Sequence, residues 1–84
     1  MRAPAIVQVL YFAAAREKIG LAQEAVALPA AVTTLGALRA LLAERHPILA
    51  LPAIRGAVNQ SFAGPETLIA GGDEIAFFPP TTGG

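Results

Sequence analysis

Two short apolar runs decide the fold: Ile6-Val7-Gln8-Val9-Leu10-Tyr11-Phe12 near the start of the sequence and Glu74-Ile75-Ala76-Phe77-Phe78 near its end. Both are rich in β-branched and aromatic residues and are too short for helices, so each predicts a β-strand. Because apolar side chains fill nearly every position, we expect both strands to be buried on both faces. We therefore expect them to lie side by side in the middle of one sheet.

The segment between the first strand and Pro29 predicts a short helix and a second strand. Residues 13–19 are good helix formers and are followed by Gly20, which suits the position just after a helix. Residues 23–28 alternate weakly in polarity before Pro29, which is typical of an edge strand.

The longest predicted helix is marked by leucines at helical spacing, at positions 35, 38, 41 and 42. Thr33 and Thr34 offer hydroxyl groups for its N-terminal cap. Pro47 disfavours helical geometry at His46, so we expect the helix to end there, with its leucine stripe facing the core. Residues 48–53 then predict a loop.

The remaining residues predict a hairpin and a turn. Residues 54–58 and the stretch near Phe62 flank Asn59-Gln60, and asparagine tolerates the positive φ that a tight hairpin turn needs. Gly71-Gly72-Asp73 predicts a turn before the last strand. The order strand, short helix, strand, long helix and further strands indicates an α+β fold of the β-grasp (ubiquitin-like) type. We expect one domain over residues 1–84, with a mixed sheet and the long helix packed on one face.

Composition limits the classes of function. Of 84 residues, 55% are hydrophobic and 14% are charged, with six basic and six acidic side chains. The charges are scattered and sum to zero, so there is no basic patch for a phosphate backbone and nucleic acid is not an expected partner. No apolar run approaches the roughly 20 residues that span a bilayer, and the start shows no secretory signal. We expect no membrane partner and a cytoplasmic protein.

The polar residues do not suggest a catalytic or metal site. The sequence has no cysteine, which removes disulfides, thiolate metal sites and cysteine nucleophiles. We expect His46, at a helix end, to interact with the helix dipole or with free carbonyl groups. Asp73 and Glu74 are adjacent and point apart, and Ser61 lacks partners for a catalytic triad. We therefore expect no stably bound cofactor and no metal.

The candidate chemistry lies at the end of the sequence, Phe78-Pro79-Pro80-Thr81-Thr82-Gly83-Gly84. Two prolines favour an extended conformation, so residues 79–84 predict a tail that carries the terminal carboxylate roughly 20 Å from the body of the protein. Gly83 and Gly84 have no side chains and can enter a narrow channel. The tail is therefore expected to present a reactive carboxylate at Gly84. An inert chain end is the alternative.

The stretch Gly72-Asp73-Glu74-Ile75-Ala76-Phe77-Phe78-Pro79-Pro80, with Gly83-Gly84, resembles the MoaD family, the small, sulfur-carrying subunits of molybdopterin synthase. The resemblance covers nearly the whole chain, and its other matching pieces are Leu10-Tyr11-Phe12-Ala13, Ala15-Arg16-Glu17 with Gly20, Ala37-Leu38-Arg39 and Ala57-Val58-Asn59-Gln60. The chain departs from the family pattern in residues 1–5, at Gly36 and in the loop 47–52. These departures concern stability and loop shape.

The resemblance implies that Gly84 is the functional residue. In this family an activating enzyme similar to ubiquitin E1 uses ATP to adenylate the terminal carboxylate, and a sulfur donor converts it to a thiocarboxylate. The sulfur is then transferred to cyclic pyranopterin monophosphate in the large catalytic subunit, where lysine and arginine side chains receive the tail. The resemblance also implies a heterotetramer of two small and two large subunits, in which the small subunit carries sulfur covalently and is not itself an enzyme.

The resemblance further implies which residues contact the partner. Gly83 and Gly84 form the threaded tip, and the partner-binding residues before it are Phe78, Pro79, Pro80, Thr81 and Thr82. Because adjacent strand residues point to opposite faces, one of Phe77 and Phe78 belongs to the core. We expect Phe78 to be the exposed one because it is nearer the tail.

Other interpretations stay open. The chain could be a sulfur carrier for thiazole or thiouridine synthesis, which shares the fold and the terminal Gly-Gly. It could be a ubiquitin-like modifier whose terminal glycine forms an isopeptide bond with a target lysine, or an interaction module with an inert tail. Arg16, Arg39 and Arg55 are either contacts at the rim of a partner interface or solvated charges.

Overall fold

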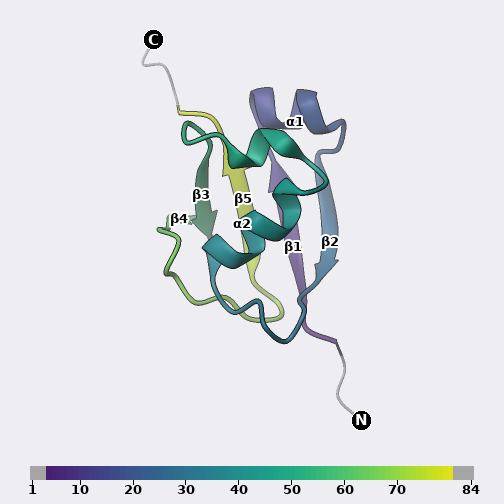
Figure 1. The fold of residues 1–84 in the computed structure, drawn as a ribbon, viewed down its shortest axis with the longest axis vertical. Coiled ribbons are helices and arrows are strands. Elements are labelled where there is room, and N and C mark those ends of the chain that lie inside the picture. The colour runs from purple at the N-terminus through teal and green to yellow at the C-terminus, as the bar shows by residue number, and fades with distance from the viewer. Residues whose placement is uncertain (1–3, 81–84) are drawn as a thin grey trace.

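The computed structural model describes residues 4–80, which form a five-stranded sheet and its covering helices (Figure 1). In chain order the elements are β1 (Ile6–Tyr11), α1 (Ala13–Ile19), β2 (Gln23–Ala27), α2 (Leu35–Ala43), the 3₁₀ helix η1 (Pro47–Ala50), β3 (Arg55–Val58), β4 (Ser61–Phe62) and β5 (Glu74–Phe78). The strand order is β2-β1-β5-β3-β4. Only β1 and β5 are parallel among the paired strands of this region. The predicted α+β fold of the β-grasp type is confirmed.

The two apolar runs lie side by side at the centre of the sheet, as predicted. Val9 lies opposite Ile75, and Tyr11 lies opposite Phe77. Because β1 and β5 are parallel, both end at the same edge of the molecule. The chain therefore leaves β5 at the end where α1 lies (Figure 1).

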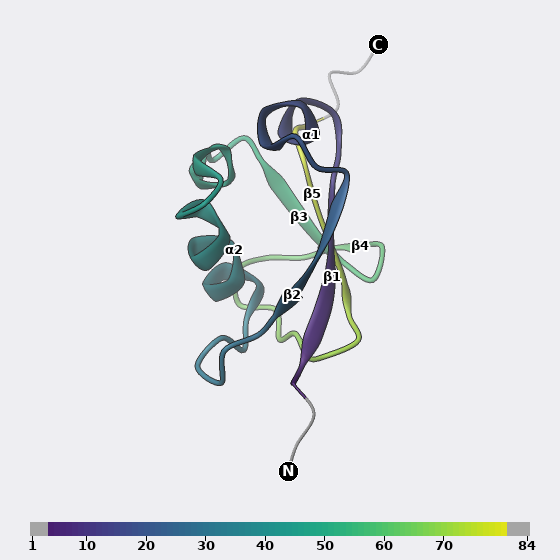
Figure 2. The same cartoon turned by 90° about the vertical axis from the view of Figure 1, so that its right-hand side faces the viewer.

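Only one face of the sheet is covered by α2, which lies on one side of the edge-on sheet in Figure 2. The buried core lies between them and consists of Val7, Val9, Tyr11, Ala15, Val26, Leu35, Leu38, Leu42, Leu49, Ile54, Ile69, Ile75 and Phe77. On the other face of the sheet, Ile6 and Phe12 are each 47% exposed. The expectation that the central strands are buried on both faces is therefore wrong. Their outward apolar residues meet no second layer.

The helix ends follow local signals in the sequence. Gly20 has a φ of 84° and donates its backbone N–H to the carbonyl of Arg16, which ends α1 as predicted. The hydroxyl oxygen of Thr34 accepts a hydrogen bond from the backbone N–H of Ala37 at 3.2 Å, so Thr34 caps α2. However, α2 ends at Ala43 rather than at His46. Within residues 4–80, no helix combines the length and the apolar character that crossing a membrane would require.

Part of the predicted loop 48–53 is the 3₁₀ helix η1, which was not expected. Leu49 is fully buried and fixes this helix against the core. Arg39 donates hydrogen bonds from α2 to the carbonyl oxygens of Leu49, at 2.6 Å, and of Leu51. Arg39 therefore has a structural role and is not simply a solvated charge.

The hairpin between β3 and β4 forms as predicted. Asn59 and Gln60 have φ values of 50° and 71°, which is the left-handed backbone that a two-residue turn requires. The Asn59 side chain also accepts a hydrogen bond from the backbone N–H of Glu74 at 2.9 Å. This contact fixes the start of β5 against the hairpin. The predicted edge strand β2 ends at Ala27, one residue early.

Gly36, where the chain departs from the MoaD pattern, is required by a close approach. A Cβ atom at this position would lie 2.9 Å from the Cβ atom of Pro65 and 3.0 Å from its carbonyl oxygen. The backbone N–H of Gly36 donates to that same oxygen at 2.9 Å. The glycine therefore lets the segment before β5 pack directly on the first turn of α2.

Candidate partner-binding face

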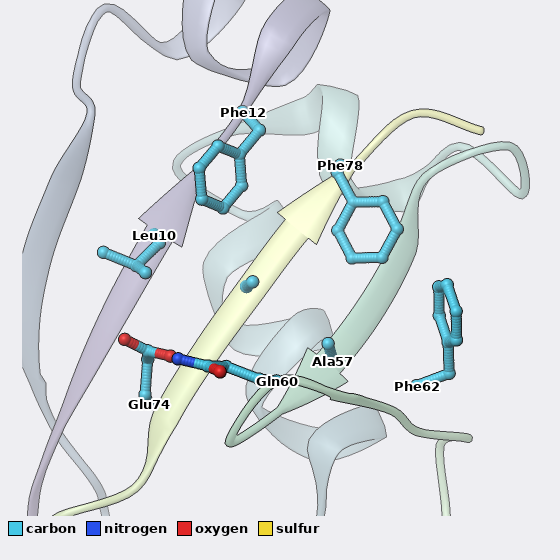
Figure 3. A pocket seen from close by; sticks show the side chains of 8 residues that line it. Leu10, Phe12, Ala57, Gln60, Phe62, Glu74 and Phe78 are labelled. Carbon is cyan, nitrogen blue, oxygen red and sulfur yellow. The ribbon is translucent and has the colours of Figure 1, made fainter. Parts of the chain in front are cut away.

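The alternation of side chains along the central strands builds a face that α2 does not cover. Its apolar residues, here called the open face, are Leu10, Phe12, Ala57, Phe62, Ala76 and Phe78. With Gln60 and Glu74 they line a shallow hollow of about 410 Å³, shown in Figure 3. Because exposed apolar surface with a polar margin is typical of interfaces, the open face is the candidate site of protein interaction.

Aromatic rings give the open face most of its apolar surface. Phe62 is 80% exposed, and its ring centroid lies 5.8 Å from that of Phe78 with the planes tilted by 54°. Aromatic side chains bury large areas when a partner covers them, so this pair suits a docking site. Phe62 belongs to the two-residue strand β4 at the edge of the sheet.

The last described residues, Phe78, Pro79 and Pro80, form the tail root. Phe78 is half-buried on the open face, whereas Phe77 is fully buried and stacks on Tyr11 with a centroid distance of 6.3 Å. Phe78 is therefore the more exposed of the two, as expected. Pro80 is exposed and lines a hollow of about 290 Å³ with Arg55, Phe62 and Phe78. The predicted site residues Thr81, Thr82, Gly83 and Gly84 lie outside the described residues.

Polar contacts hold the N-terminal end of β5 in register, at the end of the strand opposite to the tail root. Asn59 donates its side-chain N–H to a carboxylate oxygen of Asp73 at 3.1 Å. The backbone N–H of Ala70 donates to the other oxygen at 2.8 Å. The Asn59 hydrogen bond first, and then the Ala70 hydrogen bond, lower the pKa of the Asp73 carboxyl below its ordinary value. Asp73 therefore has a structural role, and Glu74 lines the open face separately.

A cluster of titratable side chains lies on the helix side of the sheet. The Tyr11 hydroxyl donates to Oε2 of Glu24 at 2.7 Å, and Nε2 of His46 lies 3.0 Å from the same oxygen. Arg45 lies 3.8 Å from the other carboxylate oxygen. The His46 ring also contacts the edge of the Tyr11 ring. His46 thus pairs with a carboxylate instead of the helix-terminal carbonyl groups that the sequence suggested.

The contacts in this cluster shift the pKa of the Glu24 carboxyl group and of the Tyr11 hydroxyl group. Burial raises the pKa of Glu24, but the hydrogen bonds with Tyr11 and His46, together with the coulombic effects of His46 and Arg45, outweigh it. The net effect is a Glu24 pKa below the ordinary value of 4.5. Burial, and then the hydrogen bond to Glu24, raises the pKa of Tyr11. The cluster joins β1, β2 and the segment that follows α2, so its role is structural.

We expect Glu24→Gln to destabilise the protein in a pH-dependent way. Because the Glu24 pKa is lowered by folding, its ionised form stabilises the protein above pH 4.5, and this contribution is lost as the pH falls through the folded-state pKa. The substitution should lower the free energy of unfolding by about 1 to 2 kcal/mol at neutral pH. The difference should shrink as the solution is acidified. Denaturant unfolding at several pH values measures it.

The matched control is Glu17→Gln, which removes an exposed carboxylate from α1. It should change the free energy of unfolding little at any pH. A Glu24→Gln effect of constant size across the acid range would contradict the assigned ion pair.

The described residues offer no ligand set for a metal. Within residues 4–80, no group of three or more histidine, cysteine, aspartate or glutamate side chains is close enough to hold an ion. The open face is apolar with single charges at its margin, which suits a protein surface rather than a small charged cofactor.

Sequence reasoning found the tail root and missed the rest of the open face. Leu10 and Phe12 were assigned to a strand buried on both faces, and Phe62 was used only to place the hairpin. The sequence predicts Ala57 and Gln60 only as parts of the hairpin and of the family resemblance. The signal in the sequence was that apolar residues fill both sides of the two central strands, whereas one long helix can cover only one face of their sheet.

A comparison with protein families identifies the chain. A model of the ThiS family matches residues 9–84, which include nearly all of the sheet and the sequence of the tail. The chain belongs to the ThiS family. Among curated ThiS-like relatives, the molybdopterin synthase sulfur carrier subunit of Haemophilus influenzae is 41% identical over 83 residues, covering 94% of this chain and all of the relative.

Two solved structures resemble this ThiS-family fold. The small archaeal modifier protein 1 from H. volcanii is 26% identical with a TM-score of 0.77, covering 92% of this chain and 99% of the other. A chain in the complex of subunits 1 and 2 of molybdopterin-converting factor from Helicobacter pylori is 26% identical with a TM-score of 0.67. That match covers 94% of this chain and 99% of the other.

Proposed function

We propose that this chain is the sulfur carrier subunit of a molybdopterin synthase and that Gly84 is its reactive residue. It acts in molybdenum cofactor biosynthesis by donating sulfur to cyclic pyranopterin monophosphate. The chain binds no stable cofactor in this role and is not itself an enzyme. Because its activation consumes ATP, the proposal assigns it to the cytoplasm, where ATP is available.

One observation carries the proposal: the open face runs directly into the tail root. Phe78 contributes to the face, and Pro79 and Pro80 follow it immediately. Proline fixes φ near −65° and cannot continue a sheet ladder, so these residues direct the chain away from β5. A partner that covers the face therefore also receives the tail. The 41% identity to a sulfur carrier subunit fits this arrangement.

The proposed chemistry begins with activation of the Gly84 carboxylate, which is a poor electrophile. One carboxylate oxygen attacks the α-phosphorus of ATP, pyrophosphate leaves, and an acyl adenylate forms. A sulfur donor, in its simplest form hydrosulfide, then attacks the carbonyl carbon. A carbon–sulfur bond forms, the bond to AMP breaks and one proton is released. The thiocarboxylate that results is a soft anionic nucleophile.

The proposed partners follow from these steps. An adenylating enzyme similar to ubiquitin E1 performs the activation, and the large subunit of molybdopterin synthase receives the sulfur. Gly83 and Gly84 enter the large subunit as the tip, with Thr81 and Thr82 in the channel behind them. The tail root and the open face stay at the mouth of the channel. Two small and two large subunits form the proposed heterotetramer.

A second candidate is a ubiquitin-like protein modifier, which the similarity to small archaeal modifier protein 1 supports. Both functions use an activated terminal glycine and differ in what attacks it. In a carrier a sulfur atom attacks, whereas in a modifier a lysine amine of another protein attacks. The products therefore differ in mass.

Intact-mass spectrometry separates the candidates. The purified chain is incubated with an E1-like activating enzyme, ATP and hydrosulfide, with omission of ATP as the control. We expect the mass increase of one sulfur atom replacing one oxygen atom, only when ATP is present. Covalent adducts with other proteins in a cell extract would support the modifier, and an unchanged mass under all conditions would contradict both.

A further inference from the structure

Arg55 is the charged residue that lies beside the tail root on the open face. It is opposite Phe78 in the antiparallel pairing of β3 with β5, and residues opposite each other point to the same face. Arg55 also lines the hollow of about 290 Å³ with Phe62, Phe78 and Pro80. Its guanidinium group is therefore placed where the chain leaves the sheet.

No other described residue neutralises Arg55. Among residues 4–80, both ion pairs involve Glu24 on the helix side of the sheet, and Arg55 takes part in neither. Arg39 differs, because it donates hydrogen bonds to the carbonyl oxygens of Leu49 and Leu51. Arg55 is exposed, and within residues 4–80 its side chain donates no hydrogen bond to a carbonyl oxygen or to another side chain.

Glu74 is the opposite charge at the other end of the same face. It lies four residues before Phe78 in β5, which is about 13 Å along a strand. Ala76 lies between Glu74 and Phe78 in β5, and Leu10 is opposite it in β1. Figure 3 shows Leu10 beside β5, between the levels of Glu74 and Phe78. This spacing exceeds the Debye length of about 8 Å at physiological ionic strength, so each charge acts on its own part of a partner. The open face therefore has a positive and a negative end.

We propose that Arg55 and Glu74 set the direction in which the open face docks on its protein partner. The partner surface carries a carboxylate that contacts Arg55 at the mouth of the channel that binds the tail. It also carries a cationic side chain that contacts Glu74. An apolar contact alone can form in either direction, whereas a reversed dock would bring like charges together. The inference rests on the proposed function, because it takes the large subunit of molybdopterin synthase as the partner.

A charge swap tests this inference without changing net charge. In the double variant Arg55→Glu/Glu74→Arg the same two charges exchange places. Its association rate constant with the cognate large subunit is measured by stopped-flow fluorescence at several ionic strengths. We expect association at low salt to be about tenfold slower than for the wild type. We expect the single variant Arg55→Gln to be slower by about threefold, with a weaker dependence on salt.

Lys18→Gln is the matched control, since it removes an exposed cation from α1 that lines a separate hollow with Arg45 and His46. It should associate at the wild-type rate, and thermal unfolding shows that each variant is folded. Equal rates and equal salt dependence for wild type and charge swap would overturn the inference and leave the proposed function standing. Failure of the wild type itself to bind the large subunit would remove the proposed function, and the inference with it.

Discussion

Deletion of Gly84 is expected to abolish sulfur transfer while leaving the fold unchanged. The reactive carboxylate would then sit one residue, about 3.3 Å, short of the adenylating and pterin sites. Misplacement of a reacting group by even about 1 Å can cost about a hundredfold in rate. Extension by one residue after Gly84 should have the same effect, because the terminal carboxylate would then lie one residue beyond its wild-type position. Sulfur transfer to cyclic pyranopterin monophosphate in the reconstituted synthase measures both variants.

The matched control shortens the chain by one residue at its other end, by deletion of Ala3. This variant should transfer sulfur at the wild-type rate. The wild type, the two variants with an altered C-terminus and the Ala3 deletion should have the same far-ultraviolet circular dichroism spectrum and the same unfolding temperature. The reason is that the core lies within residues 7–77. Sulfur transfer by either altered terminus would mean that the Gly84 carboxylate is not the reacting group.

Replacement of Phe78 by aspartate should weaken binding to the large subunit by about 30-fold. The aromatic ring lies on the open face at the tail root, and burial of such a side chain by a partner contributes about 2 kcal/mol, which corresponds to that factor. The substitution also puts a carboxylate into an apolar contact. Isothermal titration calorimetry measures the dissociation constant. Phe77 is not used for this test, because it is fully buried and its loss would destabilise the core.

Leu68→Asp provides the control for Phe78→Asp. Leu68 is 76% exposed, so it is also a surface apolar residue, but it is not part of the open face. Its replacement should leave the dissociation constant unchanged. Equal affinities of wild type and Phe78→Asp would place the partner contact elsewhere on the molecule.

The parts of the fold with strong local signals could be predicted from the sequence. The runs that form β1 and β5 contain β-branched and aromatic residues, and their central pairing was predicted correctly, although the premise that both of their faces are buried was wrong. Thr34 offered a cap, and Asn59-Gln60 offered a turn, and both are used as expected. The strand alternation also placed Phe77 and Phe78 on opposite faces, and the choice of Phe78 as the exposed ring rested on its nearness to the tail. In each case the residue type determines the local backbone or the side-chain direction.

Features that depend on tertiary contacts could not be predicted in the same way. Apolar residues on both sides of β1 do not indicate whether a helix or a partner covers the second side. The cluster of Tyr11, Glu24 and His46 joins residues 13 and 22 positions apart, so no local pattern marks it. Likewise, Arg39 stabilises η1 through carbonyl groups 10 and 12 residues away. The site was therefore predictable at the tail root and not across the open face.

The position of the added sulfur in the chain decides whether Gly84 is the reacting residue. The chain is treated with the activating enzyme, ATP and hydrosulfide, and the product is fragmented in a tandem mass spectrometer. We expect the added sulfur only in fragments that contain Gly84, as a thiocarboxylate at the end of the chain. A protein that gains sulfur elsewhere, or that gains none with an active activating enzyme, would contradict it.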